Sequence, residues 1–244
     1  MNKILMDRVD EFDLSKTFYE FDKDNKYFVE VADLKNEICL VVLENVNITL
    51  NILGNRVNLD LRIKVGKNSS LVINSFIIDG SINVYSVLED FNASFKLYNS
   101  ILATNDSLNK IEVKHLSKNT NSYLKNHGFS LDGSKIIFDV DSYVPNDSSS
   151  CVAKQDNKII GEDNSLSQIN PNLYIDNYDI EASHSAYVGE FKEEEIFYLM
   201  SRGLTLEDSK FLLLKSFLVG SMEVEDEVLE KYCGSVVKFF NKEV

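Results

Sequence analysis

One histidine, His184, lies in the part of the chain whose residue types could best bind a metal ion or carry a proton. A neutral imidazole can ligate iron or relay a proton near neutral pH. The alternative is a strand histidine whose ring makes only structural hydrogen bonds. The surrounding residues alternate like a strand and run directly into two short helices, the first ending at Ser201-Arg202-Gly203. A candidate chemical site therefore adjoins a candidate docking surface.

The three cysteines, Cys39, Cys151 and Cys233, are far apart and form no C-x-x-C pair. Because no histidine cluster accompanies them, we do not expect a preformed zinc or cluster site. Cys39 lies in an apolar run and is predicted to be buried in the core, and Cys233 is predicted to pack within the last helix. Cys151 is the candidate for handling sulfur, although a buried core cysteine is the more common state. The sparse, odd cysteine count fits a reducing compartment.

Composition and charge exclude several function classes. A net charge of −14 argues against nucleic acid as a partner, because phosphate binding needs a basic surface. The N-terminal residues have the pattern of neither a signal peptide nor a membrane span, so we expect a cytoplasmic protein with no membrane partner. The sequence contains no P-loop, no G-x-S-x-G and no H-E-x-x-H. The sequence therefore indicates a protein that is not an enzyme.

Alternation of apolar and polar residues with period two dominates the chain from Glu37 onward. It is clearest in Val57–Val65, Ser70–Ile78 and Ile82–Leu88, with Asn, Asp and Gly at the breaks. Closely spaced strands without a helical stretch indicate an all-β body. Sandwiches, barrels and β-helices share this pattern. Short polar corners and only two prolines favour a β-solenoid, since strands inside a sheet exclude proline.

The expected organisation has three parts. Residues 1–36 form a short N-terminal lead-in, residues 37–189 the β-helix core and residues 190–244 a C-terminal helical segment. Within that segment Thr205-x-x-Asp208 is a variant capping box that predicts the start of the second helix. Helical spacing of apolar residues predicts a last amphipathic helix over Glu223–Lys242.

The residues from Leu173 to Gly203 resemble the C-terminal core of the SufB/SufD family, the scaffold proteins of the SUF iron–sulfur cluster assembly machinery. In that family a strand of the type L-x-I-x-x-x-D-x-x-x-S-H-x-A-x-V-G precedes an acidic helix with F-Y-L-x-S-R-G. The matching residues here are Leu173, Ile175, Asp179, Ser183, His184, Ala186, Val188, Gly189, Phe197 to Leu199 and Ser201 to Gly203. A second, weaker match consists of His115, Asn119, Thr120, Ser122, Gly128 and Asp132. Here His115 is predicted to point inward and His127-Gly128 to form a turn.

The resemblance implies a right-handed parallel β-helix and a non-enzymatic scaffold closer to SufD than to SufB. It implies a SufC-like ABC ATPase that docks on the C-terminal helices. It also implies pairing with a SufB-like subunit, or with a second copy, through β-helix edges. Iron or an iron–sulfur cluster would be bound only transiently in the assembled complex, with no stably bound cofactor. The chain is short for the family at its N-terminus, which puts the contacts of the usual helical N-terminal region in doubt.

The same resemblance assigns the site residues. His184 is the expected cluster-assembly and iron ligand, and it is expected at the end of a solenoid strand. The catalytic cysteine of SufB-type members would fall at Asn164 and their glutamate at Ser185, which leaves Cys151 as the only substitute for handling sulfur. The expected contact with the ATPase comprises Phe197, Tyr198, Arg202, Phe211, Leu214 and Leu218.

Two other functions remain open from the sequence. A β-solenoid carbohydrate-active enzyme would need a groove of acids and aromatic residues along one face of the solenoid. The missing signal peptide weighs against the extracellular enzymes of this kind. A purely structural β-helix would have no part in cluster assembly. Only the scaffold function requires an ATPase partner.

Overall fold

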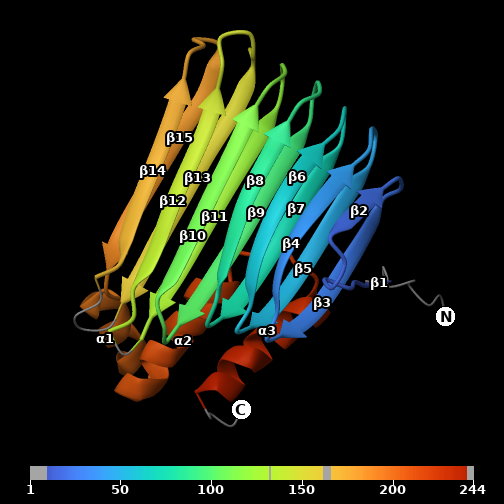
Figure 1. The fold of residues 1–244 in the computed structure, drawn as a ribbon. Helices are drawn as coiled ribbons and strands as arrows, with labels where there is room; N and C mark the ends of the chain where they lie inside the picture. The colour runs from blue at the N-terminus through green and yellow to red at the C-terminus, as the bar shows by residue number, and fades with distance from the viewer. Residues whose placement is uncertain (1–9, 132, 162–165, 241–244) are drawn as a thin grey trace, which may run out of the picture.

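The computed structural model describes residues 10–131, 133–161 and 166–240, which form two parallel sheets and three helices. The chain alternates between the sheets, so odd-numbered strands form one sheet and even-numbered strands the other (Figure 1). The strands are β1 (Asp10–Glu11), β2 (Phe18–Phe21), β3 (Asn25–Ala32), β4 (Lys35–Val42), β5 (Asn47–Asn55), β6 (Asn58–Val65), β7 (Ser70–Ile78), β8 (Ser81–Leu88), β9 (Ser94–Ala103), β10 (Ser107–His115), β11 (Asn121–Ser130), β12 (Ile136–Val144), β13 (Cys151–Gly161), β14 (Gln168–Ile175) and β15 (Ile180–Gly189). Neighbouring strands pair in parallel with the strand one coil away. The predicted mainly β, parallel β-solenoid is confirmed.

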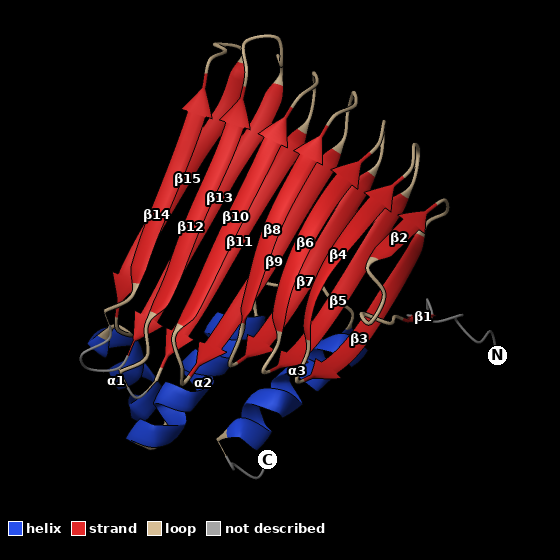
Figure 2. Cartoon of the chain, in the orientation of Figure 1, coloured by secondary structure: helices blue, strands red, loops and turns tan. Residues whose placement is uncertain are grey.

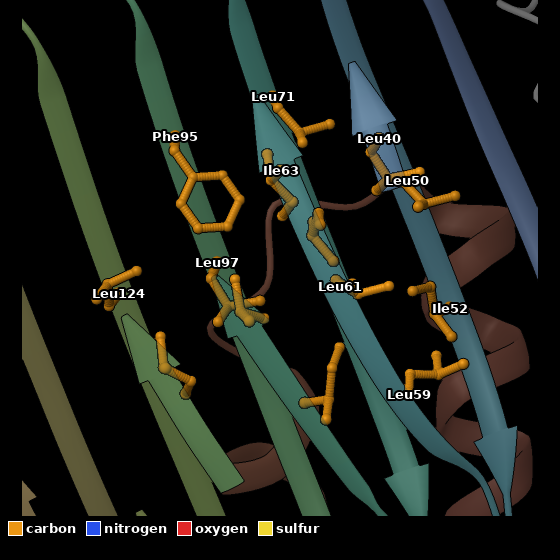
Figure 3. Close-up of a cluster of buried hydrophobic side chains, with 14 of the residues drawn as sticks. Leu40, Leu50, Ile52, Leu59, Leu61, Ile63, Leu71, Phe95, Leu97 and Leu124 are labelled. Atoms are coloured by element: carbon orange, nitrogen blue, oxygen red, sulfur yellow. The ribbon is translucent and has the colours of Figure 1, made fainter. Parts of the chain in front are cut away.

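Inward-facing aliphatic side chains of the two sheets fill the solenoid. In β6, exposed and buried residues alternate strictly, because successive side chains point to opposite faces of a strand. Leu59, Leu61 and Ile63 therefore face inward, where Ile63 stacks on its register partner Leu40 (Figure 3). Burial of each such side chain stabilises the fold by about 1.5–3 kcal/mol. The coils are held together by this interior and by the backbone ladders.

Asparagines form one row of corners between the coils. Asn45, Asn68, Asn92 and Asn119 have positive φ angles of 60°, 53°, 59° and 58°. Asn tolerates this left-handed conformation because its short side chain can hydrogen-bond locally. Asn68 Nδ2 donates to Asn45 Oδ1 (3.3 Å) and Asn92 Nδ2 donates to Asn68 Oδ1 (3.2 Å), so corners of successive coils are linked.

The two ends of the solenoid differ. At the N-terminal end, β1 and β2 have only two and four residues. Phe12, Tyr19, Phe21 and Tyr27 form an aromatic cluster there, with ring centroids 4.4–6.5 Å apart. β1 pairs with two residues of β3, and β2 pairs with four residues of β4. At the other end, β14 and β15 have eight and ten residues and no buried side chain. We call this end, formed by β14 and β15, the open end.

The predicted boundary at residue 37 does not coincide with a break in the structure. β2 and β3 lie within the predicted lead-in, yet they pair in register with β4 and β5. The described part of the lead-in therefore belongs to the first coils of the solenoid, because its strands extend the same two sheets. Residues 1–9 lie outside the described residues.

Three helices follow the last strand: α1 (Glu193–Ser201), α2 (Leu206–Val219) and α3 (Asp226–Phe239). They gather at one side of the solenoid, where α2 and α3 cover the odd-strand sheet (Figure 2). The apolar residues at this contact include Leu218 and Tyr232 from the helices and Phe76 and Leu102 from the strands. Thr205 caps α2 as predicted, since its Oγ1 accepts from Asp208 N (3.1 Å). Within the described residues, no helix has both the length and the apolar character needed to cross a bilayer.

Hydrogen bonds fix the helices at defined points on the sheet. Tyr232 Oη donates to Asn74 O (2.9 Å) and Ser100 Oγ donates to Leu218 O (2.5 Å). Glu223, between α2 and α3, accepts from Lys96 Nζ (3.1 Å) and from Tyr98 Oη (2.6 Å). These bonds hold α2 and α3 in register with particular strands, which apolar packing alone would not specify.

Two sequence-based expectations about single residues are wrong. Cys39 is half-buried on the outward face of β4, because strand alternation turns Ile38 and Leu40 inward. His127 and Gly128 do not form a turn but lie within β11. Gly128 packs closely there, since an added Cβ would lie 3.0 Å from the Ile136 side chain and would require that side chain to shift.

Two histidines are buried in the fold. The His115 ring nitrogens hydrogen-bond to Thr120 Oγ1 (2.8 Å) and Ser122 Oγ (2.9 Å), which confirms its inward direction. His127 Nδ1 donates to Phe217 O in α2 (2.7 Å), and its ring stacks on the Phe217 ring. Burial lowers the pKa of each histidine to about 4, because the charged imidazolium is disfavoured away from water.

We expect the free energy of unfolding to fall as the pH is lowered from 6.5 toward 4. In the unfolded chain both histidines take up a proton near pH 6.5, whereas in the folded chain they stay neutral until about pH 4. The stabilisation is therefore complete above pH 6.5 and is lost below it. At pH 5 the loss is on the order of 2 kcal/mol per histidine. Urea unfolding at pH 7.5 and pH 5 measures the difference.

The control for this prediction is Ser183→Ala, which changes an exposed residue that does not titrate and should leave the pH dependence unchanged. Equal stability of the parent chain at the two pH values would contradict the prediction.

Candidate functional site

His184 lies in the middle of β15, the edge strand of the odd-strand sheet at the open end. It is thus at the end of the solenoid but not at the end of a strand, which corrects the expected position. Ile180 and Ala182 of the same strand pack on the inward-facing Val144 and Cys151. By alternation, His184 shares this inward face. Its side chain is nevertheless exposed, because no further coil among the described residues covers β15.

The inward face becomes polar next to His184. Its register partner on β13 is Gln155, which is 3% exposed. Gln155 Nε2 donates to Ser142 Oγ (3.0 Å), to Asn172 O (3.1 Å) and, at 3.4 Å, to Val140 O on the even strands. This glutamine therefore bridges the two sheets at the last two coils.

A row of buried amide side chains also leads to the open end. Ser75 Oγ donates to Asn99 Oδ1 (3.0 Å), and Asn99 Nδ2 is 3.4 Å from Asn126 Oδ1. Asn126 Nδ2 donates to Asn157 Oδ1 (2.7 Å), and Asn157 Nδ2 donates to Ser185 O (3.3 Å). The row crosses four coils and ends on the backbone next to His184. We call Gln155, Asn157, His184 and Ser185 the open-end site.

Cys151 is buried apart from this site. Its thiol hydrogen-bonds to Thr120 Oγ1 (3.2 Å) and to Ser117 O (3.3 Å). Its register partner is Ile180, four residues before His184, which corresponds to roughly 13 Å along the strand. The structure therefore brings Cys151 next to Thr120 and the buried His115 but not next to His184.

The two positions at which SufB-type members carry ligands differ in what the structure describes. Asn164 lies outside the described residues. Ser185 Oγ donates to Asp156 Oδ1 (2.7 Å), so its hydroxyl has a structural partner on β13. In the described part of the chain, no group of three or more His, Cys, Asp or Glu residues is arranged to hold a metal ion. His184 would thus need ligands from outside the described residues to complete a metal site.

The first helix, α1, is the least embedded element of the C-terminal segment, since none of its residues is buried. Phe197 and Tyr198 are 62% and 59% exposed. The Arg202 guanidinium lies over the Tyr198 ring, 5.3 Å from its centroid. An apolar cavity of about 610 Å³ beside α1 is lined by Phe197 and by Phe211 of α2. We define the docking surface as Phe197, Tyr198, Arg202 and Phe211.

Leu214 and Leu218 do not belong to this surface, contrary to the expectation. Both are buried on the inner side of α2, where they contact the core formed with the odd strands. Leu214 also contributes to the lining of the cavity beside α1, whereas Leu218 is fully covered by the sheet. Helical periodicity identified an apolar face of α2 but did not indicate that the solenoid itself covers it.

Sequence reasoning missed Gln155 and Asn157. A signal for them is present in C-V-A-K-Q-D-N-K-I, where Gln155 and Asn157 share the alternation phase of Cys151 and Ile159. Polar residues in an inward phase are costly unless hydrogen-bonded, so they mark structural or functional positions.

A shallow groove on the outward face of the even-strand sheet is the feature that a carbohydrate-active enzyme would need. Its lining includes Glu37, Arg62, Tyr85 and Glu112. Glu37 forms an ion pair with Arg62 (2.5 Å), and Glu112 forms one with Lys114 (3.1 Å). Glycoside hydrolysis uses one protonated and one ionised acid flanking the bond. Carboxylates engaged with cations in this way do not favour that function.

We expect Cys151 to stay unmodified by thiol reagents in the folded chain and Cys39 to react first. A reactive thiolate must be accessible, and Cys151 is 1% exposed whereas Cys39 and Cys233 are partly exposed. Burial also raises the pKa of Cys233, which slows its reaction. Mass spectrometry after brief alkylation measures the order. The control variant Cys151→Ser should match the parent in label uptake, and rapid labelling of Cys151 would contradict the expectation.

Comparison with known proteins agrees with this geometry. The model of the family described as "SUF system FeS cluster assembly, SufBD core domain" matches residues 52–217. The chain is 29% identical over 129 residues to the iron–sulfur cluster assembly protein SufD of Bacillus subtilis (strain 168), covering 52% of this chain and 30% of that protein. It is 52% identical over 40 residues to an iron–sulfur cluster assembly SufBD family protein of Pyrococcus horikoshii, covering 16% of this chain and 9% of that protein.

A plant relative, the chloroplastic protein ABCI7 of Arabidopsis thaliana, is 39% identical over 64 residues, covering 26% of this chain and 12% of that protein. In each case the matched part is less than a third of the relative's length. The family model, in contrast, spans most of the solenoid and continues into α2. The chain therefore belongs to the SufBD core domain family of the SUF iron–sulfur cluster assembly system, with a resemblance to SufD.

Proposed function

We propose that this protein is a non-enzymatic scaffold subunit of a SUF iron–sulfur cluster assembly complex, in which His184 contributes a ligand to the nascent cluster. The observation that carries the proposal is the position of His184, exposed on the inward face of the last strand of the solenoid. Iron and the cluster are the cargo of this reaction and are held only while the complex is assembled.

The open end is the proposed surface for pairing with a second scaffold chain, either a SufB-like subunit or another copy. Edge strands of eight and ten residues present unpaired backbone groups that another β-solenoid can satisfy. Together they carry one charged residue, Glu181, although the chain has a net charge of −14. Charge repulsion therefore opposes pairing less here than elsewhere on the surface.

Pairing at the open end gives His184 the ligands that it lacks in the single chain. An imidazole nitrogen binds iron readily, but stable clusters are held mainly by thiolates. Cys151 is buried and lies roughly 13 Å from His184 along the strands, so it is poorly placed to supply one. In the proposed complex, the partner chain supplies thiolates across the shared interface.

The docking surface is the proposed contact for a SufC-like ABC ATPase. Exposed aromatic residues beside an apolar cavity, with an arginine at the edge, have the composition of interface hot spots. α1 follows β15 after only a short connection, from Gly189 to Glu193. Movement of α1 driven by the ATPase would therefore act directly on the strand that carries His184.

We expect the double variant Tyr198→Ala, Arg202→Ala to weaken ATPase binding at least tenfold. Loss of a hot-spot aromatic residue and of the arginine stacked on it removes about 2 kcal/mol or more of binding free energy. Pull-down or titration calorimetry with the purified ATPase measures the change. The matched control is Arg62→Ala, Tyr85→Ala, an arginine–tyrosine pair on the outward face of the even-strand sheet. Undiminished binding by the first variant would refute the docking surface.

We expect His184→Ala to fold and bind the ATPase like the parent, yet to lower the iron and cluster content of the reconstituted complex several-fold. The side chain is exposed, so its loss costs little stability, but it removes a ligand. Iron content and the visible absorption of the complex after reconstitution measure the effect. Ser183→Ala on the same strand is the control and should keep the parental content. Cluster assembly at the parental rate by His184→Ala would leave the histidine a structural residue.

A further inference from the structure

One inward column of the odd-strand sheet changes character at its last two positions. From β3 onward, the register partners in this column are Tyr27, Leu50, Ile73, Leu97, Leu124, Gln155 and His184. At the N-terminal edge, the register partner of Tyr27 on β1 is the exposed Asp10. Leu50, Leu97 and Leu124 point into the aliphatic interior (Figure 3). Gln155 is the first residue of the column with a polar amide, and it lies directly beneath the candidate ligand.

The orientation of the Gln155 amide is determined by its partners. Its Nε2 lies within hydrogen-bonding distance of the carbonyl oxygens Asn172 O and Val140 O, which can only accept. The nitrogen must therefore face the even strands, and the two ends of the amide cannot be exchanged. Gln155 Oε1 is buried and has no hydrogen-bond partner among the described residues. A buried acceptor left without a donor is costly, so its presence calls for a reason.

The neighbours of Gln155 in the column limit which side chain can supply the missing donor. On β11 the register partner is Leu124, which has no polar atom, and on β15 it is His184. Side chains of register partners on adjacent parallel strands share a face and lie about 5 Å apart. His184 is exposed and its ring has no hydrogen-bond partner among the described residues, so the ring can turn.

We infer that Gln155 is the positioning residue for His184: its Oε1 accepts a hydrogen bond from one ring N–H of His184 and so fixes the ring and its tautomer. A neutral imidazole has one N–H and one nitrogen with a free lone pair. Because the amide oxygen can only accept, it takes the N–H and leaves the lone-pair nitrogen to face out of the open end. A ligand nitrogen held in this way suits a divalent iron ion, since metal-bound histidines ordinarily donate their second N–H to a fixed acceptor.

This inference extends the role proposed for His184. Only the functional meaning of the hydrogen bond rests on that proposed role, whereas the hydrogen bond itself does not. The geometry of the ring can be measured without iron, without the ATPase and without the second scaffold subunit. The inference can therefore fail while the scaffold function stands. Equally, cluster assembly could prove independent of His184 while the ring remains held by Gln155.

The test is the tautomer ratio of His184 in the folded full chain, read from the ¹⁵N chemical shifts of its ring nitrogens at pH 8. At this pH an ordinary imidazole is neutral. His184→Ala identifies the signals among those of the three histidines. We expect one tautomer to dominate in the parent. In Gln155→Met, which has a side chain of similar length without the amide, the ratio should fall about fivefold toward that of the urea-unfolded chain, as expected for the loss of one hydrogen bond.

The matched control is Asn51→Leu, which removes a buried amide on β5, outside the row that ends at Ser185, and should leave the His184 ratio as in the parent. If Gln155 had a purely structural role, Gln155→Met and the control variant would both lower the free energy of unfolding, and neither would change the tautomer ratio of His184. An unchanged ratio in Gln155→Met would overturn the inference. If that variant fails to fold, the parent alone decides: a ratio equal to that of the urea-unfolded chain would also overturn it.

Discussion

The structure depends on in-register stacking of parallel coils. Each strand satisfies its backbone on the strand one coil away, 23 residues along the chain in the early coils and 31 in the later ones. Each inward side chain likewise packs on its register partner, as Ile63 does on Leu40. A coil is therefore stable only because of its neighbours, as in other solenoid proteins. At each of the two ends, the last coil has a neighbouring coil on one side only, and the two ends differ in structure.

At the N-terminal end, two short strands and an aromatic cluster cover part of the edges of β3 and β4. At the open end, the two long strands β14 and β15 have no buried side chain. A row of inward polar side chains begins at Ser75 on β7 and ends at the backbone of Ser185, and Gln155 adds a second buried amide at the last coils. Polar groups inside a solenoid are hydrogen-bonded at the cost of apolar packing. Their concentration beside the exposed His184 is the strongest structural sign that this end serves a function beyond folding.

Two of the three C-terminal helices, α2 and α3, cover the outer face of the odd-strand sheet, whereas α1 buries none of its residues. α2 and α3 are fixed by apolar contacts and by bonds such as Tyr232 to Asn74 and Glu223 to Lys96. α1 has no comparable anchor among the described residues and exposes Phe197 and Tyr198. An amphipathic helix that buries none of its residues within its own chain is suited to pack on another chain. The short connection from Gly189 to Glu193 thus links β15 at the open end to the exposed surface of α1.

The sequence by itself determined the class of the fold and the residues of the motif, because period-two alternation, asparagine corners and helix caps are local properties. β7 spans Ser70–Ile78 as predicted, and the end of α1 and the cap of α2 also agree with the sequence. The sequence could not tell which face of an element the rest of the chain covers. Leu214 and Leu218 were therefore assigned to a surface, Cys39 to the core and His127 to a turn. Register between strands far apart in sequence was equally out of reach, since it is set by the stacking of whole coils. Only the tertiary structure placed Gln155 beneath His184, kept Cys151 away from it and left β15 as the edge strand in the part of the chain that the structure describes.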